Sequence, residues 1–367
     1  MKFLKKILAE TPLSFLLVMI PIAMFCEMRE TTAAWRFLSS GLAVIPLAGL
    51  LGSATEDLTE TMGPGLGGFL NGSLGNAAEL IIGLVAIREG PVMYPLVKAS
   101  ITGSIVGNVL FVLGMSFVAG GIRHHTQKFN RTAASTGATL LALAAVSLVI
   151  PAAYYTIASG TPGRAARVVH VSEEISVILL IVYALNLLFL LHTHKSIFNH
   201  VQAHEKKAAP GKVNSRRDAL IMLALATAGI AYVSEIFVGS AQDAATSFGM
   251  NPVFIGVFVV AVVGNAAEHS SSVLMAIKNK LDVSLMITVG SSIQIALFVA
   301  PVLLFSSLLI NPSHPLDLHF TLLEVLSVVI SMLILAFVCQ DGESNWLEGV
   351  MMLGVYIILA VAFYNLP

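Results

Sequence analysis

Long apolar runs separated by short polar segments make up most of this chain. A membrane-spanning helix needs about 20 mostly apolar residues, and the sequence holds eleven such runs. Helices are expected because lipid cannot satisfy exposed backbone polar groups. The predicted spans are 8–26, 36–58, 65–88, 94–119, 132–158, 170–192, 217–246, 252–278, 283–309, 319–339 and 346–366.

The connections between these runs are short except at 193–216, which is polar and rich in positive charge. We therefore predict an N-terminal transmembrane helix at 1–30, five-helix units at 31–192 and 217–367, and a cytoplasmic linker between the units. The basic start followed by an apolar run is also typical of a signal peptide. No small-x-small cleavage pattern follows the run, which favours a membrane anchor.

Composition supports an all-α integral membrane protein. The chain is 56% hydrophobic and 11% charged, against about 25% charged residues in soluble domains. Its net charge of -1 gives no sign of nucleic-acid binding. Cys26 and Cys339 form no spacing pattern and are expected to be packing residues. No HExxH, GxGD or rhomboid-like Ser/His pattern is present, so we do not expect an enzyme, and no cofactor is indicated.

Positive charges predict the orientation, because Lys and Arg are enriched in cytoplasmic loops. With a cytoplasmic N-terminus, fourteen of the twenty Lys and Arg residues fall in cytoplasmic segments. An odd number of spans then places the C-terminus on the opposite side of the membrane.

The sequence GNAAE occurs twice, at 75–79 and at 264–268. The copies fall on the third and eighth predicted spans, so the repeating unit is five helices. Because five is odd, the second unit enters the membrane in the opposite sense to the first. Transporters built from inverted repeats of this kind bind their substrates near the bilayer midplane, where the repeats meet.

The similarity extends beyond the five letters. "GSATEDLTETMGP" parallels "GSAQDAATSFGMNP", and "TGSIVGNVLFVLG" parallels "VGSSIQIALFVAP". A shared richness in small apolar residues would not match polar positions at matching offsets. The aligned pairs are Glu56 with Asp243, Ser104 with Ser291, and Gly107 with Gln294.

Each motif places a carboxylate inside a predicted span, at Glu79 and at Glu268. A charge there costs about 2.5–3.5 kcal/mol on insertion scales. Each acid can be protonated, or the pair can share a divalent cation. Exchange between these states would exchange protons for metal. A structural hydrogen-bonding role is the alternative, and two copies with identical flanks weaken it.

The neighbouring side chains favour a hard cation. They offer oxygen donors without thiolates, and Ca²⁺ takes six to eight oxygens in flexible geometry. We expect Glu79 and Glu268 to be the metal ligands. The other expected cation- or proton-binding residues are Asn76, Asn265, Ser104, Ser291 and Gln294.

Four further residues are candidates for the ion pathway, each with a plain structural alternative. Glu56 and Asp243 lie near predicted helix ends and would otherwise be solvated acids. Glu235 lies deeper in its span. His269 follows Glu268 directly and would either handle protons or simply pack, since adjacent helical residues point about 100° apart. Glu324 has no evident partner in the sequence.

The segments "GPGLGGFLNGSLGNAAELIIGLVAIREG" and "VGNAAEHSSSVLMAIKNKLDVSLMITVGSSIQIALFVAP" closely resemble the signature repeats of the calcium/proton exchangers, a branch of the calcium/cation antiporter superfamily. The resemblance runs from about residue 40 to the C-terminus and includes "DGESNWLEG". It implies an eleven-span fold with a lone first helix and two inverted five-helix units. It also implies that Glu79 and Glu268 are the central acids, assisted by Asn76 and Asn265, with Ser104, Ser291 and Gln294 nearby.

The expected function is export of cytosolic Ca²⁺, with other divalent cations as further substrates, in exchange for H⁺ by alternating access. A sodium-coupled calcium exchanger on the same fold and a cation channel are the alternatives. Short loops suggest a prokaryotic plasma membrane. Family members often carry an acidic run where this chain has a linker rich in His and Lys, so an acidic calcium-sensing patch is not supported.

Overall fold

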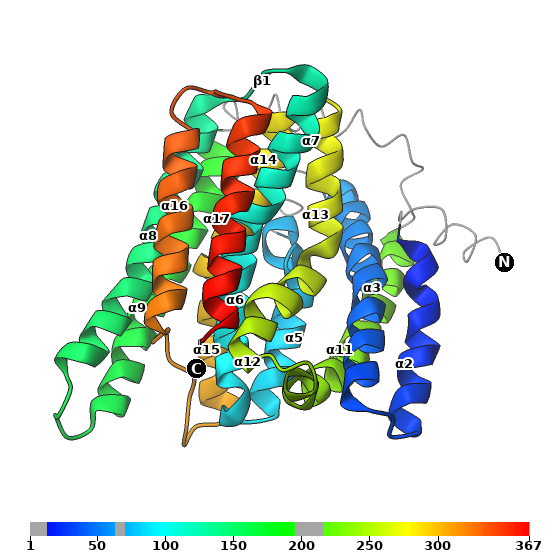
Figure 1. The fold of residues 1–367 in the computed structure, drawn as a ribbon, viewed down its shortest axis with the longest axis vertical. Helices are drawn as coiled ribbons and strands as arrows, with labels where there is room; N and C mark the ends of the chain where they lie inside the picture. Colours follow the sequence, from blue (N-terminus) through cyan, green and yellow to red (C-terminus); the bar gives the residue numbers. More distant parts are fainter. Residues whose placement is uncertain (1–12, 63–69, 195–215, 367) are drawn as a thin grey trace.

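Long, roughly parallel helices build the protein (Figure 1). The structure is a computed structural model that describes residues 13–62, 70–194 and 216–366. The first part of the chain contains η1 (Ser14–Val18), α2 (Met19–Met28), α3 (Ala33–Met62), α5 (Ala77–Arg88), η2 (Pro91–Met93), α6 (Tyr94–Val106), η3 (Gly107–Val112), α7 (Leu113–His124), β1 (Gln127–Lys128), α8 (Arg131–Ile157), α9 (Arg164–Leu188) and η4 (Phe189–Thr193). The second part contains α11 (Arg216–Ser247), α12 (Pro252–Phe254), η5 (Ile255–Val260), α13 (Ala261–Ile277), α14 (Leu281–Gln294), η6 (Ile295–Val299), α15 (Ala300–Ile310), α16 (Leu322–Val338), β2 (Glu343–Ser344) and α17 (Trp346–Tyr364).

The helices confirm an α-helical integral membrane protein. Within the described residues, 8 helices are long and apolar enough to cross a bilayer, and shorter apolar helices cover Ser14–Met28 and Leu322–Val338. The predicted starts at 8 and 65, and most of the predicted linker at 193–216, lie outside the described residues.

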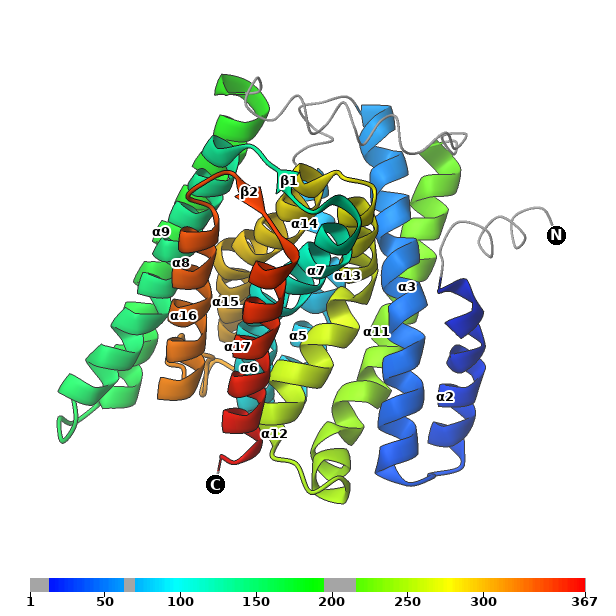
Figure 2. The same ribbon diagram turned by 45° about the horizontal axis from the view of Figure 1, so that its top comes forward.

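Helices α3 and α11 lie side by side over most of their length (Figure 2). Small residues permit this close approach, as is common between helices in membranes. A methyl group at Gly41 of α3 would meet the ring of Phe237 at 2.9 Å. That ring stacks on Phe37 with centroids 4.6 Å apart. The pair lies at the contact between the two parts of the chain.

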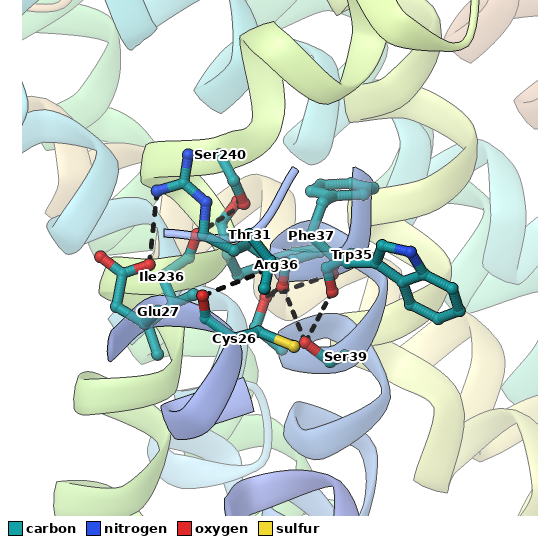
Figure 3. Close-up of polar contacts among 11 residues, drawn as sticks. Cys26, Glu27, Thr31, Trp35, Arg36, Phe37, Ser39, Ile236 and Ser240 are labelled. Atoms are coloured by element: carbon teal, nitrogen blue, oxygen red, sulfur yellow. Dashed lines mark hydrogen bonds and ion pairs between the residues drawn. The ribbon is translucent and has the colours of Figure 1, made fainter. Parts of the chain in front are cut away.

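Helix α2 lies outside the bundle and packs against α3 (Figure 2). Figure 3 shows the polar contacts at the turn between them. Arg36 Nη1 lies 3.4 Å from Glu27 Oε2, and the Thr31 hydroxyl donates a hydrogen bond of 3.1 Å to the carbonyl of Cys26. These contacts attach the lone first helix to the start of α3.

Buried hydroxyl groups inside the helices bond to their own backbone. Ser40 donates to the carbonyl of Arg36, Ser240 donates to that of Ile236, and Ser292 donates to that of Thr288. Such bonds to the carbonyl four residues earlier satisfy a hydroxyl where no water is present.

Two ends of the bundle can be distinguished. The end that carries the two short strands is called here the strand face, where Gln127 pairs with Ser344 and Lys128 with Glu343. On the same face, the backbone N–H of Asn130 donates to Asp282 Oδ1 at 2.5 Å. Loops from both parts of the chain are thereby joined at this end.

The opposite end carries residues 311–321 and is called here the loop face. Lys98 Nζ donates to Asp317 Oδ1 at 2.5 Å and to the carbonyl of His319 at 2.8 Å. The His319 ring stacks on the Tyr155 ring with centroids 3.8 Å apart. The guanidinium of Arg164 also lies over the Tyr155 ring. This end is therefore also held by contacts between the two parts of the chain.

Candidate cation site

The first GNAAE copy lies at a break in a helix. Residues 70–74 are helical, Gly75 and Asn76 form a turn, and α5 begins at Ala77. Glu79 therefore lies in the first turn of α5. The N-terminal end of a helix carries partial positive charge, so a carboxylate is favoured there. Broken helices of this kind line ion sites in many transporters.

The second GNAAE copy has a different backbone. Gly264 and Glu268 lie inside the continuous helix α13, which follows the π-helical turn η5. The same five-residue sequence thus adopts two backbone conformations. The residues before the two copies also differ, since Gly72 aligns with Ala261 and Ser73 with Val262. Glycine weakens a helix more than alanine does, which permits a break before the first copy.

The two motifs face one another. A methyl group at Gly264 would lie 3.1 Å from Oε1 of Glu79, so the glycine leaves room for that carboxyl group. Gly264 precedes Glu268 by four residues in α13, so the two share one face of that helix. The structure therefore brings the two predicted acids together from separate parts of the chain.

The motif asparagines each bond to the other part of the chain. Asn76 donates through Nδ2 to Gln294 Oε1 at 2.7 Å, and its Oδ1 accepts from the Ser291 hydroxyl at 2.7 Å. Asn265 donates through Nδ2 to Ser104 Oγ at 3.0 Å. All five side chains predicted to accompany the acids are thus in one group with them.

Two of these helices also carry π-helical turns just past their serines. Turn η3 follows Ser104 in the chain, and turn η6 follows Ser291. Aligning 102–114 with 289–301 places the two turns at corresponding positions. Such turns are frequent at functional sites because they rotate the side chains that follow them.

Sequence reasoning missed Asn108, which lies in η3. Its Nδ2 donates to Ser291 Oγ at 3.1 Å, and its Oδ1 lies 3.1 Å from His269 Nε2. An amide oxygen only accepts, so Nε2 carries the hydrogen and donates. One feature of the sequence could have identified this residue: Asn108 is polar, whereas Ile295, the residue aligned with it in the repeat, is apolar. His269, predicted as a pathway residue, joins the group through Asn108.

Several buried oxygens at the site accept no hydrogen bond from the described residues. They are Oε1 of Glu79, Oε2 of Glu268 and Oδ1 of Asn265. Unsatisfied buried acceptors are rare, and they suit a bound cation or proton. Among the described residues, no group of three or more His, Cys, Asp or Glu side chains is arranged to hold a metal ion. The donor set is therefore two carboxylates with neutral oxygens, which fits Ca²⁺ better than zinc.

Two hollows of different size flank this group. A cavity of about 130 Å³ lies between α8, α9 and α14, and its lining includes Asp282, Gly290 and Gln294. A separate hollow of about 20 Å³ is lined by Glu79 and mostly apolar side chains such as Ile82 and Leu303. The larger space extends toward Asn130 and Asp282, which belong to the strand face.

The three other predicted pathway acids are exposed rather than buried with the site. Glu56 lies on α3, and Asp243 and Glu235 lie on α11. Glu235 lies 3.4 Å from Arg88 at the end of α5, and both side chains are about half exposed or more. Their role in the pathway stays a prediction.

Glu324, in contrast, has a partner that the sequence interpretation did not find. The carboxylate accepts from the backbone N–H of Thr321 at 2.8 Å and from its hydroxyl at 2.7 Å, forming a capping box at the start of α16. This acid therefore has a structural role at a helix end.

Comparison with known proteins places the chain in a family. The family model described as sodium/calcium exchanger protein matches residues 32–192 and again residues 219–365. The "Ca(2+)/H(+) antiporter ChaA" of Bacillus subtilis is 40% identical over 95% of this chain and 97% of its own length. The "Vacuolar calcium ion transporter" of Schizosaccharomyces pombe is 37% identical over 99% of this chain and 87% of its own.

A solved structure has the same fold. "Structure of native YfkE" superposes with a TM-score of 0.81 at 36% identity, covering 96% of this chain and 100% of that one. The family model covers most of the chain, and the relatives match it nearly end to end. The chain is therefore a member of the sodium/calcium exchanger protein family.

Proposed function

We propose that this protein is a secondary active transporter that exports Ca²⁺ from the cytosol in exchange for H⁺. The observation that carries the proposal is the meeting of Glu79 and Glu268 in a buried group whose free acceptors are all oxygens. Relatives that match nearly the whole chain are named Ca²⁺/H⁺ antiporters, which supports these two substrates.

The architecture that we propose is a lone first helix followed by two inverted five-helix units. The family model matches the chain twice, once on each side of residues 193–216. The π-helical turns η3 and η6 occur at corresponding positions of the two matches. The long helices, the two shorter ones and the segment that ends with α5 add up to eleven spans.

Charge balance couples the two fluxes. Two adjacent bare carboxylates repel each other and are poorly solvated, so an empty, fully ionised site is unfavourable. Protons neutralise the acids in one state, and a divalent cation neutralises both in the other. Asn76, Asn265, Ser104, Ser291 and Gln294 supply neutral oxygens around the cation. Each ion leaves only when the other replaces it.

The strand face is the cytosolic face in this proposal. The positively charged segments predicted to be cytosolic include the loop with Lys128 and the one with Lys278 and Lys280. The larger cavity extends toward this face, which corresponds to a site accessible from the cytosol. Glu56 near the strand face and Asp243 near the loop face would line the two routes.

Transport by reconstituted protein tests the proposal. Liposomes carrying the protein and an imposed pH gradient should take up Ca²⁺, and both Glu79→Gln and Glu268→Gln should reduce uptake to background. Glu27→Gln is the matched control, because it neutralises an acid outside the site that pairs with Arg36. Near-normal uptake by either motif variant would contradict the site, and downhill flux without coupling would indicate a channel.

A further inference from the structure

Six amide and carboxyl oxygens of the site fall into two sets. The first set accepts no hydrogen bond within the described part of the chain and comprises Glu79 Oε1, Glu268 Oε2 and Asn265 Oδ1. Those of the second set each accept a hydrogen bond from a neighbouring side chain. The second set comprises Asn76 Oδ1 with Ser291, Gln294 Oε1 with Asn76, and Asn108 Oδ1 with His269.

The hydrogen bond on Asn108 differs in kind from the other two. The donors to Asn76 and Gln294 are themselves oxygen-bearing groups of the site, and they can turn toward a cation together with their acceptors. His269, in contrast, donates from a ring N–H and has no side-chain oxygen that could turn toward a cation. The ring is buried and meets Phe111 edge to face at 6.4 Å, and Phe111 stacks on Tyr356 at 5.0 Å. The donor is thus held in place by packing.

The pair of His269 and Asn108 has no counterpart at the positions that the repeat aligns with it. The residue aligned with His269 in the first motif is Leu80, and the residue aligned with Asn108 in the second part is Ile295. Asn108 is one hydrogen bond from the ligand group, because its Nδ2 donates to Ser291. Its oxygen faces His269, so the amide must turn over before that oxygen can face the ligand group, and this costs the hydrogen bond to His269.

We propose that His269 determines cation selectivity by holding Asn108 Oδ1 turned away from the ligand group, which keeps the site too poor in oxygen ligands to accept Na⁺. This inference rests on the proposed function. A divalent ion is held by both carboxylates, whose charge it matches. A monovalent ion gains half as much from each carboxylate at the same distance, so it depends more on neutral oxygens. Withdrawing one amide oxygen therefore weakens Na⁺ binding more than Ca²⁺ binding.

The test compares two driving forces in the same proteoliposomes. Ca²⁺ uptake is measured under a pH gradient, and then under a Na⁺ gradient with the pH clamped equal on both sides. Wild type should respond only to the pH gradient. His269→Leu, which copies the residue aligned with it in the first motif, should gain Na⁺-driven uptake. Na⁺ should also inhibit its pH-driven uptake at a concentration about tenfold lower than for wild type, as expected from one hydrogen bond exchanged for one ligand.

Two further variants separate this role from packing. His269→Gln keeps an N–H donor and should stay indifferent to Na⁺. The double variant His269→Leu with Asn108→Leu removes the released oxygen, so its response to Na⁺ should disappear. A merely structural role for His269 would not produce a gain in one variant and its loss in the other.

Defined outcomes would overturn the inference. One is a His269→Leu protein that still exchanges Ca²⁺ for H⁺ but ignores Na⁺, and another is a double variant that still responds to Na⁺. If His269→Leu does not transport, competition of Na⁺ with radioactive Ca²⁺ for the purified protein replaces the flux assay, and no increase in competition overturns the inference. Failure of the proposed function is distinct, because wild type would then show no uptake under a pH gradient.

Discussion

Oδ1 of Asn76 accepts a hydrogen bond of 2.7 Å from the Ser291 hydroxyl, across 215 positions of the chain. Asn76 is the residue just before the helix that carries Glu79, and Ser291 lies on α14 and also accepts a hydrogen bond from Asn108 Nδ2. A single hydroxyl thus connects the first motif with Asn108. It donates its one hydrogen to Asn76 and accepts from Asn108.

Removing this hydroxyl should therefore weaken transport. Ser291→Ala leaves Asn76 Oδ1 and Asn108 Nδ2 without their partner, and each unpaired buried group costs about 1–3 kcal/mol. We expect Ca²⁺ uptake at limiting Ca²⁺ to fall about tenfold or more. The control is Ser292→Ala, because the neighbouring hydroxyl bonds only to the carbonyl of Thr288 among the described residues. Equal effects of the two substitutions would argue against the link.

Gly103 and Gly290 are aligned by the repeat, but a methyl group added at each should affect stability differently. A Cβ at Gly103 of α6 would overlap the backbone of Val257 in η5, whereas a Cβ at Gly290 of α14 meets nothing within 4 Å. Overpacking costs about 1–3 kcal/mol or more, and alanine is the better helix former by about 1 kcal/mol. Gly103→Ala should lower the melting temperature in detergent, and Gly290→Ala should leave it unchanged or raise it. The reverse order would be inconsistent with the packing.

Acid should weaken the loop face through His319. Burial lowers the pKa of His319 below its ordinary value, Asp317 opposes this shift, and Lys98 and Arg164 add to it. The unfolded chain then binds the proton first, so stability falls as the pH drops below about 6.5 toward the lower pKa of the folded state. His319→Phe keeps a ring against Tyr155 without the proton site. Its melting temperature should fall less between about pH 7 and pH 5 than that of wild type, and equal slopes would refute this assignment.

Access to the two hollows should be unequal. In a protein with Cys26 and Cys339 replaced by alanine, Met286→Cys lines the cavity of about 130 Å³, and Ser100→Cys lines the hollow of about 20 Å³. A water-soluble maleimide added on the strand face should label Met286→Cys readily and Ser100→Cys slowly. Labelling of Ser100→Cys alone from that face would mean that the site opens the other way.

Much of the fold followed from patterns that are local in the chain. Apolar runs located the helices to within a few residues, since insertion in lipid depends mainly on the composition of each segment. The duplicated GNAAE identified both acids and their asparagines. Ser104 and Ser291 were predicted because the repeat aligns them with each other, and Gln294 was predicted as a neighbouring amide oxygen donor.

Contacts between distant segments were harder to foresee. Asn108 and His269 are 161 positions apart, and neither aligns with a polar residue in the other unit. The partner of Glu235 is Arg88 at the end of another helix, and pairing there depends on how α5 packs on α11.

The sequence by itself determined where the long apolar segments lie and that GNAAE occurs twice, and it predicted which two carboxylates require neutralisation in the membrane. These are properties of composition and spacing. Only the tertiary structure decided that one motif breaks its helix at Gly75 and Asn76 while the other stays helical, and that His269 occupies the oxygen of Asn108. Helix breaks and hydrogen-bond partners depend on neighbours that packing brings in from the other half of the chain.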